Sequence, residues 1–271
     1  MKSILVHLDA SPRAAERLAL ARGLAKRHGA ELTAVYGVLS SMLATPWLDG
    51  GAASVSALMA ELDRNQRERA RALFDRVLGD LGARWVEASG EGIAWSVARS
   101  ALTSDLVVLG QPDPEDRQTG ALPPDLVTSV VIDSGKPSLL VPYAGSFDPA
   151  PREVLLAWKP TREAARAASA ALPWLQAASR VHVVAQGTPE LPQPFEPLEH
   201  WLRLEGVAAP LMRHTLAPIE AGEALLSLAA ELDVGLLVMG CYGHSRAREW
   251  VLGGASRTIL QSMTLPVLMV H

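Results

Sequence analysis

The chain has 271 residues, a net charge of −4, and 49% hydrophobic against 20% charged residues. This balance excludes global disorder and suits a folded protein of about two domains, while the lack of any basic excess or Lys/Arg run argues against a nucleic-acid binder. The single cysteine, Cys241, excludes an intramolecular disulfide and a cysteine metal cage.

The first apolar stretch, residues 4–8, is too short for a membrane segment. It ends at Asp9 and is followed by charged residues, so it is neither a signal-peptide core nor a membrane span. No other stretch reaches the roughly 18 uncharged apolar residues that a span requires. We therefore expect a soluble, cytoplasmic protein with no membrane association, and a lone cysteine is typical of that reducing compartment.

Short apolar runs alternate with longer helical patterns, and such runs are typical of strands buried on both faces of a parallel sheet. In the first half, strands are expected near residues 3–8, 31–38, 83–88, 105–110 and 137–142, and helices near 12–28, 55–80, 91–102 and 124–134. In the second half, strands are expected near 153–158, 180–185, 208–214, 235–240 and 266–270, and helices near 161–177, 195–205, 219–232 and 255–263. Ser11 is expected to cap the first helix, with Pro12 at its first position and Gly29 beyond its end.

The two halves of the chain repeat each other. Matched segments are Ser3–Asp9 with Glu153–Lys159, Asp105–Gly110 with Gly235–Gly240, and Lys136–Pro142 with Leu265–His271. Three pairs in the same order indicate two homologous domains, which we place at 1–143 and 152–271 with a linker at 144–151. Each is predicted to be an α/β domain, a five-stranded parallel doubly wound (Rossmann-like) sheet with helices on both faces.

A glycine-rich loop is expected after the fourth strand of the second half. Doubly wound sheets bind ligands beyond the carboxyl ends of their strands, where the strand order reverses. In this loop, two residues separate Gly240 from Gly243 and nine separate Gly243 from Gly253. Glycines let the backbone approach a ligand closely, and the N–H groups of a helix start attract an anion. The loop and the helix start that follows it therefore predict a phosphate site.

With this repeat and this loop, the chain resembles a tandem universal stress protein, which is two stress-protein domains fused in one polypeptide. Family members that bind ATP carry Gly-x-x-Gly, nine residues, then Gly-Ser or Gly-Thr. The second half matches except that Gly254 stands where Ser or Thr is usual. The resemblance implies that the C-terminal domain binds ATP or another adenine nucleotide, with or without Mg²⁺. It implies backbone contacts from Gly240, Gly243, Gly253, Gly254 and Ala255, a hydroxyl contact from Ser256, and an adenine side lined by Met239, Ala157, Trp158 and Gln186.

The first half departs from this binding pattern. Asp9 stands where nucleotide-binding relatives present a carboxylate to the adenine amino group, whereas Lys159 holds that place in the second half. After the fourth expected strand of the first half, Asp113 aligns with Gly243, and Pro123-Pro124-Asp125 replaces the glycine pair. A carboxylate repels phosphate, and proline has no N–H to donate. We therefore expect that the first half does not bind ATP in the family's usual way.

The residues leave three functions open. The first is a universal stress protein whose C-terminal domain binds ATP and whose nucleotide state modulates protein partners in a stress response. The alternative is an interaction module that binds no nucleotide and keeps a relic loop. The third is an enzyme that transfers or cleaves an adenylyl group. Because the sequence has no catalytic elbow, metal-spaced His pair or Walker motif, we expect no catalytic residues, no metal ligands and at most slow ATP hydrolysis.

Two further expectations concern contacts. The resemblance implies that the two domains pair within one chain through their last strands, Ser138–Val141 and Val267–Val270, aligned edge to edge, which hides two sheet edges. A homodimer of the whole chain stays open. Cys241 lies in the glycine-rich loop, where an accessible thiol would be a candidate for redox sensing.

Overall fold

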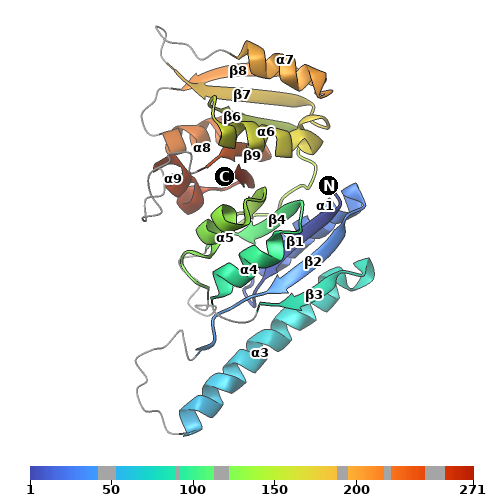
Figure 1. Cartoon of the computed structure of the whole chain (residues 1–271), viewed down its shortest axis with the longest axis vertical. Helices are drawn as coiled ribbons and strands as arrows, with labels where there is room; N and C mark the ends of the chain where they lie inside the picture. Colours follow the sequence, from blue (N-terminus) through green and yellow to red (C-terminus); the bar gives the residue numbers. More distant parts are fainter. Residues whose placement is uncertain (42–52, 89–91, 113–121, 188–194, 217–220, 242–253) are drawn as a thin grey trace. The chain divides into compact units, whose positions relative to one another are not determined.

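The structure is a computed structural model that describes residues 1–41, 53–88, 92–112, 122–187, 195–216, 221–241 and 254–271 (Figure 1). The chain divides into two compact units, Met1–Lys136 and Pro137–His271. The expected linker, residues 144–151, lies within the second unit. The domain bounds 1–143 and 152–271, which follow from the sequence repeat, stay a prediction.

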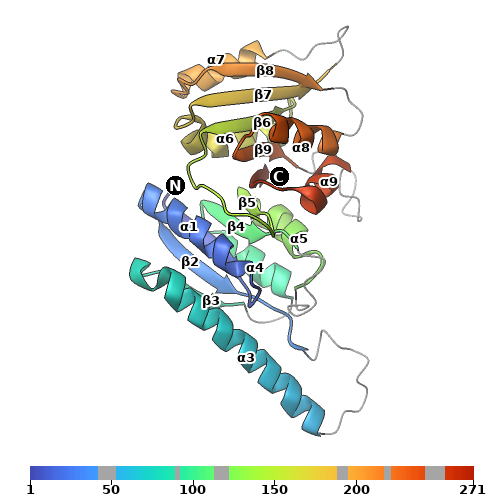
Figure 2. The same ribbon diagram turned by 180° about the vertical axis from the view of Figure 1, so that it is seen from behind.

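The first unit contains four parallel strands in the order β3-β2-β1-β4. The strands are β1 (Ser3–Leu8), β2 (Glu31–Tyr36), β3 (Arg84–Glu87) and β4 (Leu106–Gly110). The helices are α1 (Ala14–His28), α3 (Ala53–Leu78), α4 (Ile93–Ala101) and α5 (Leu126–Ser134), with a short 3₁₀ turn at Gly79–Leu81. Helices α1 and α3 cover one face of the sheet, and α4 and α5 cover the other (Figures 1 and 2).

The second unit contains six strands in the order β5-β10-β9-β6-β7-β8. The strands are β5 (Ser138–Val141), β6 (Glu153–Trp158), β7 (Arg180–Gln186), β8 (Leu211–Leu216), β9 (Leu236–Gly240) and β10 (Val267–Val270). The helices are α6 (Arg162–Leu175), α7 (Glu196–Leu204), α8 (Ala221–Glu231) and α9 (Gly254–Ser262). Helix α6 lies on one face of this sheet, and α8 and α9 lie on the other (Figures 1 and 2).

The central strands form the core of each unit. Val6 on β1 and Val108 on β4 are fully buried in the first unit, as are Leu156 on β6 and Val238 on β9 in the second. Strands that lie between two helical layers must be apolar on both faces, which explains their unbroken hydrophobic runs. The predicted fold class, α/β with doubly wound sheets covered by helices on both faces, is confirmed.

The expected start of the first helix is wrong by two residues. Helix α1 begins at Ala14, and the residue at its N-cap is Arg13 and not Ser11. Instead the backbone N–H of Ser11 donates to Asp9 Oδ1 at 2.8 Å, so this turn is organised around the carboxylate. The expected end is confirmed, because Gly29 adopts a φ of 60° and closes the helix.

The expected pairing of the two last strands is confirmed. Strands β5 and β10 pair antiparallel, with Leu139 opposite Leu268. The other five strands of the second unit pair in parallel, so β5 is the antiparallel strand of this unit.

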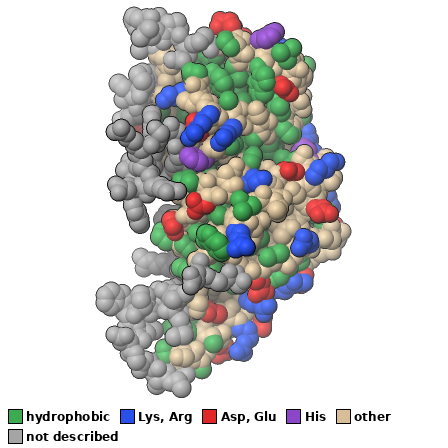
Figure 3. All heavy atoms as spheres, viewed as in Figure 1, with side chains coloured by type: hydrophobic (Ala, Val, Ile, Leu, Met, Phe, Trp, Pro, Cys, Tyr) green, Lys and Arg blue, Asp and Glu red, His purple; other side chains and the backbone are tan. Residues whose placement is uncertain are grey.

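The surface of the described residues carries mixed charges. On the face in view in Figure 3, Lys and Arg side chains are interspersed with Asp and Glu. Within the part of the chain that the structure describes, no helix is both long enough and apolar enough to cross a bilayer.

Candidate functional site

The candidate site lies at the carboxyl edge of the sheet in the second unit. Strand β6 pairs with β7 on one side and β9 on the other, so the strand order reverses between β6 and β9. Ala157 on β6 is directly opposite Met239 on β9. Trp158 ends β6 opposite Ala185, one residue before Gln186 ends β7. The structure therefore brings the four residues expected on the adenine side to one edge of the sheet.

The first turn of α9 contains three of the residues predicted to bind an anion. Gly254, Ala255 and Ser256 are the first three residues of this helix. The N–H groups of a first turn have no partner inside their own helix. Gly254 is exposed, and a Cβ built on it would meet no atom within 4 Å. Gly243 and Gly253, the two remaining glycines of the predicted site, lie outside the described residues.

Gly240 ends β9 beneath the first turn of α6. A Cβ at this position would lie 2.5 Å from the backbone nitrogen of Ala164 and 2.6 Å from the carbonyl carbon of Glu163. Helix α6 is held there by its own cap, because the Thr161 hydroxyl accepts a hydrogen bond from the N–H of Ala164 at 3.3 Å. Packing alone therefore requires glycine at position 240, whether or not a ligand binds.

Two residues at this edge, Glu163 and Gly222, were not predicted from the sequence. Glu163 is 3% exposed and accepts a hydrogen bond from Arg162 Nε at 2.5 Å. Burial opposes ionisation of Glu163, but the contact with Arg162 outweighs burial and lowers its pKa. A Cβ at Gly222 on α8 would lie 3.0 Å from the backbone oxygen of Ala255, so α8 packs tightly on the first turn of α9. A glycine inside a helical pattern was the available signal for this close approach.

Cys241 and Lys159 differ in their exposure. Cys241 is only 2% exposed, so the expectation of an accessible thiol is wrong. Burial, with a smaller contribution from the Glu163 carboxylate, raises its pKa well above the usual range, which keeps the thiol protonated and unreactive. Lys159 is exposed just beyond the end of β6.

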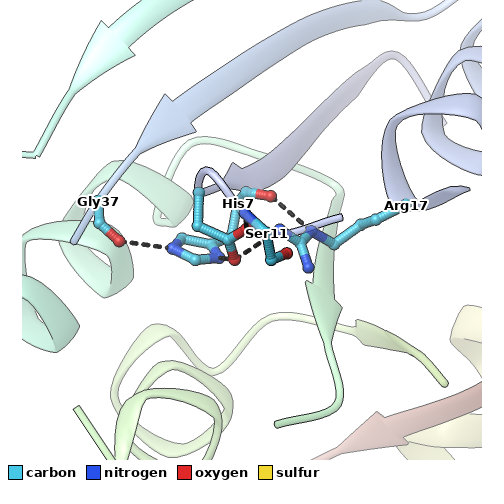
Figure 4. A network of polar contacts seen from close by, with 5 residues as sticks. His7, Ser11, Arg17 and Gly37 are labelled. Atoms are coloured by element: carbon cyan, nitrogen blue, oxygen red, sulfur yellow. Dashed lines mark hydrogen bonds and ion pairs between the residues drawn. The ribbon is translucent and has the colours of Figure 1, made fainter. Parts of the chain in front are cut away.

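At the corresponding edge of the first unit, a buried ion pair fills the space. Asp9 and Arg17 are 1% and 4% exposed, and Arg17 Nη2 donates to Asp9 Oδ2 at 2.9 Å. Arg17 Nε also donates to the backbone oxygen of His7 at 2.7 Å. The guanidinium group covers Gly110 at the end of β4 so closely that a Cβ there would overlap it. Figure 4 shows these side chains converging on one another.

The matched starts of β1 and β6 identify the counterparts of these residues in the second unit. Position 157, the counterpart of His7, is alanine, and so is position 167, the counterpart of Arg17. Lys159 replaces Asp9. The second unit therefore has no counterpart of the ion pair at the edge where its candidate site lies.

The electrostatics of the first unit favour a fixed, internally satisfied cluster. Burial opposes ionisation of Asp9, but the charge of Arg17 and contacts with His7 and Ser11 outweigh it and lower the Asp9 pKa to about 2. Burial, reinforced by Arg17, lowers the His7 pKa to about 4, so His7 is neutral at pH 7. Its Nε2 lies 2.8 Å from the backbone oxygen of Gly37, to which the neutral ring donates. Asp9 is therefore ionised but already paired within the protein.

The first unit should lose stability as the pH falls from about 6.5 to about 4, because the folded state buries His7 in its neutral form. The pKa of His7 is lowered in the folded state, so the unfolded chain binds more protons in this window and stability falls as the pH falls. A shift of this size corresponds to roughly 3 kcal/mol. The Asp9 contribution is lost only below its unfolded pKa of 3.8, outside this window.

Urea unfolding at pH 7 and pH 4.5 checks this expectation. His7→Gln, which keeps a donor for Gly37, should lose less stability on acidification than the unsubstituted protein. His200→Gln, at an exposed position on α7, is the matched control and should behave like the unsubstituted protein. Equal losses in all three proteins would contradict the assignment to His7.

Within the described residues, no group of three or more His, Cys, Asp or Glu side chains is placed to hold a metal ion. Polar side chains at the described part of the second unit's edge are few, and Ser256 is itself 5% exposed. The arrangement offers backbone N–H groups and apolar walls, which suit binding rather than acid–base chemistry.

A sheet covered by helices on both faces, with the strand order reversing between β6 and β9, defines a doubly wound α/β protein. The universal stress protein family matches residues 152–271. The second half of the chain is thus a universal stress protein domain, and the whole chain has the fold of a tandem member of that family.

Two solved structures share this fold over the full length, and a third matches about half of the chain. A universal stress protein from Archaeoglobus fulgidus DSM 4304 covers 99% of this chain and 95% of its own, with 15% identity and a TM-score of 0.71. The match to a putative universal stress protein from Pseudomonas aeruginosa UCBPP-PA14 spans 100% of this chain and 93% of that protein, with 15% identity and a TM-score of 0.60. The match to a universal stress protein in complex with cAMP spans 45% of this chain and 98% of that protein, with 20% identity and a TM-score of 0.35. No curated protein matches the chain.

Proposed function

We propose that the second unit binds an adenine nucleotide, ATP in the first instance, between the carboxyl edge of its sheet and the first turn of α9. The observation that carries the proposal is the pairing of Ala157 with Met239 at the point where the strand order reverses. Ala157 and Met239 are apolar, and apolar side chains suit contact with a flat base. The exposed start of α9 at Gly254 offers N–H groups to phosphate.

The first unit would not take part in this binding. Its counterpart edge is filled by Arg17, and the Asp9 carboxylate is committed to that guanidinium at 2.9 Å. An adenine amino group would have to displace a buried, charge-assisted hydrogen bond to reach Asp9. We therefore infer one nucleotide per chain, with its regulatory effect on partners in a stress response exerted from the second unit.

Calorimetry with ATP, ADP and cAMP, each with and without Mg²⁺, tests the proposal; cAMP is included because a half-length relative was solved with it. Gly254→Asp places a carboxylate where phosphate would lie, at an exposed position with open space around it. We expect at least a tenfold loss of ATP affinity from this substitution. The variant should stay folded, because an acidic residue in the first turn of a helix is mildly stabilising. Gly254→Ala, which adds a methyl group without charge, is the matched control and should bind ATP like the unsubstituted protein.

Two outcomes would count against the proposal. If millimolar nucleotide gives neither heat nor a thermal shift, the second unit binds none of these ligands, because binding to the native state must raise stability. If ATP binds equally well to Gly254→Asp, the nucleotide lies elsewhere on the chain.

A second candidate, an interaction module with a relic loop, is favoured by one specific observation. Gly240 is required by the packing of α6 on β9, so its presence needs no ligand to explain it. The calorimetric experiment separates the two candidates, because an interaction module would show unchanged partner binding and no response to nucleotide.

A further inference from the structure

Four polar side chains form a cluster on β6, β7 and β8, at the far side of the second unit's sheet from β5. His182 is 3% exposed, and its Nε2 lies 2.8 Å from Glu153 Oε2. Its other ring nitrogen, Nδ1, lies 3.0 Å from Nε2 of His214 on β8. Arg180 holds the second oxygen of Glu153 at 3.0 Å. The proposed nucleotide site does not use any of these groups.

The Glu153 carboxylate determines which nitrogen of His182 carries the proton. Glu153 Oε2 lies 2.8 Å from His182 Nε2, and because a carboxylate oxygen accepts hydrogen bonds, Nε2 carries the ring proton and donates it to Glu153. His182 Nδ1 therefore presents a lone pair toward His214. A carboxylate behind the ring is the arrangement that orients and strengthens a metal-binding histidine.

The separation of the two imidazole nitrogens suits a shared metal ion. Metal–nitrogen bonds of about 2.0–2.1 Å, at angles between square and tetrahedral, place two ligand nitrogens about 2.9–3.4 Å apart. The observed distance of 3.0 Å lies in that range. On binding, the proton of His214 Nε2 would move to its Nδ1, and the metal would take its place.

A methionine next to this pair indicates which metal is preferred. Met212 is the register partner of His182 and lies two residues before His214, so the three residues share one face of the sheet. Its side chain is 45% exposed, which is unusual for a large apolar residue on a strand. A thioether is a soft ligand that suits copper, and divalent copper also ranks above zinc for imidazole nitrogen.

We propose that His182 and His214, oriented by Glu153 and assisted by Met212, bind one copper ion at the β7–β8 edge of the second unit. The remaining coordination positions would be taken by water, since His214 is only partly buried. The proposal is independent of the nucleotide, because β8 is the outermost strand of this sheet, two strands away from the β6–β9 crevice.

Calorimetric titration of the full chain with Cu²⁺ and Zn²⁺ in a non-coordinating buffer tests the site. We expect one copper per chain, bound more tightly than zinc. His214→Ala should weaken copper binding at least tenfold, and Glu153→Gln should weaken it by about tenfold to a hundredfold. His200→Ala, which removes an exposed histidine from α7, is the matched control and should change nothing.

Met212→Leu gives a second, milder measurement at an exposed position. It should lower the affinity for Cu⁺ and leave the affinity for Zn²⁺ unchanged. The Cu⁺ is kept reduced by ascorbate, and its affinity is measured by competition with bicinchoninate. Copper affinity that is equal in the unsubstituted protein and in His214→Ala would overturn the proposal, as would the absence of any stoichiometric heat. The cluster would then be a hydrogen-bonded network that only ties β6, β7 and β8 together.

Discussion

Replacing Asp9 with alanine should lower the free energy of unfolding of the first unit by about 3–5 kcal/mol, the cost of leaving a buried charge without its partner. The Arg17 guanidinium is 4% exposed and donates to Asp9 at 2.9 Å. The substitution also removes the acceptor of the Ser11 N–H. Urea unfolding followed by circular dichroism measures the effect, with the two units fitted as separate transitions where they do not unfold together.

The repeat supplies a matched control for this substitution. Lys159→Ala alters the corresponding position of the second unit, where the side chain is exposed, and should change stability by no more than about 0.5 kcal/mol. The double variant Asp9→Leu with Arg17→Met removes both charges together and should recover much of the lost stability. If Asp9→Ala lowers the free energy of unfolding by less than about 1 kcal/mol, Arg17 finds water or another acceptor, and the cluster is not closed.

Gly240→Ala should destabilise the second unit by about 1–3 kcal/mol, because the new methyl group would overpack the contact between β9 and α6. The added carbon would lie 2.5 Å from the Ala164 nitrogen, and that backbone is fixed by the cap of its helix. Unfolding without any nucleotide measures this effect. Gly254→Ala, at the other glycine of the described site, meets open space and should be tolerated.

The comparison of these two glycines also separates packing from binding. If Gly240→Ala proved as stable as the unsubstituted protein, α6 would have room to shift, and the glycine would need a ligand to explain it. If instead Gly254→Ala were the more destabilising change, the first turn of α9 would be packed more tightly than the structure describes.

The fold was largely readable from the sequence because its signals are local. The apolar runs at β1 and β6 coincide with the strands to the residue, since both are buried by helices on each face. The end of α1 at Gly29 was equally local, because only a left-handed residue closes that helix. The start of α1 was not local, since the turn before it is organised around Asp9, which accepts a hydrogen bond from the Ser11 N–H.

The sites were less readable because they depend on contacts between distant residues. The aligned position of Asp9 indicated a ligand-binding carboxylate. Only the fold shows that Arg17, in the first turn of α1, neutralises this carboxylate. His182 and His214 are 32 residues apart, and nothing in their flanks marks them as neighbours. Parallel register placed them together, and register is set by the packing of whole strands.

The antiparallel pairing of β5 with β10 determines how this protein can be dissected. Residues 138–141 belong to the first repeat by descent but complete the sheet of the second unit. A fragment cut at the repeat boundary, starting at Arg152, would leave one side of β10 with unsatisfied backbone groups and invite self-association. A fragment starting at Pro137 would keep the β5–β10 ladder and all six strands of the second unit, so the better point of division falls before the last strand of the first repeat.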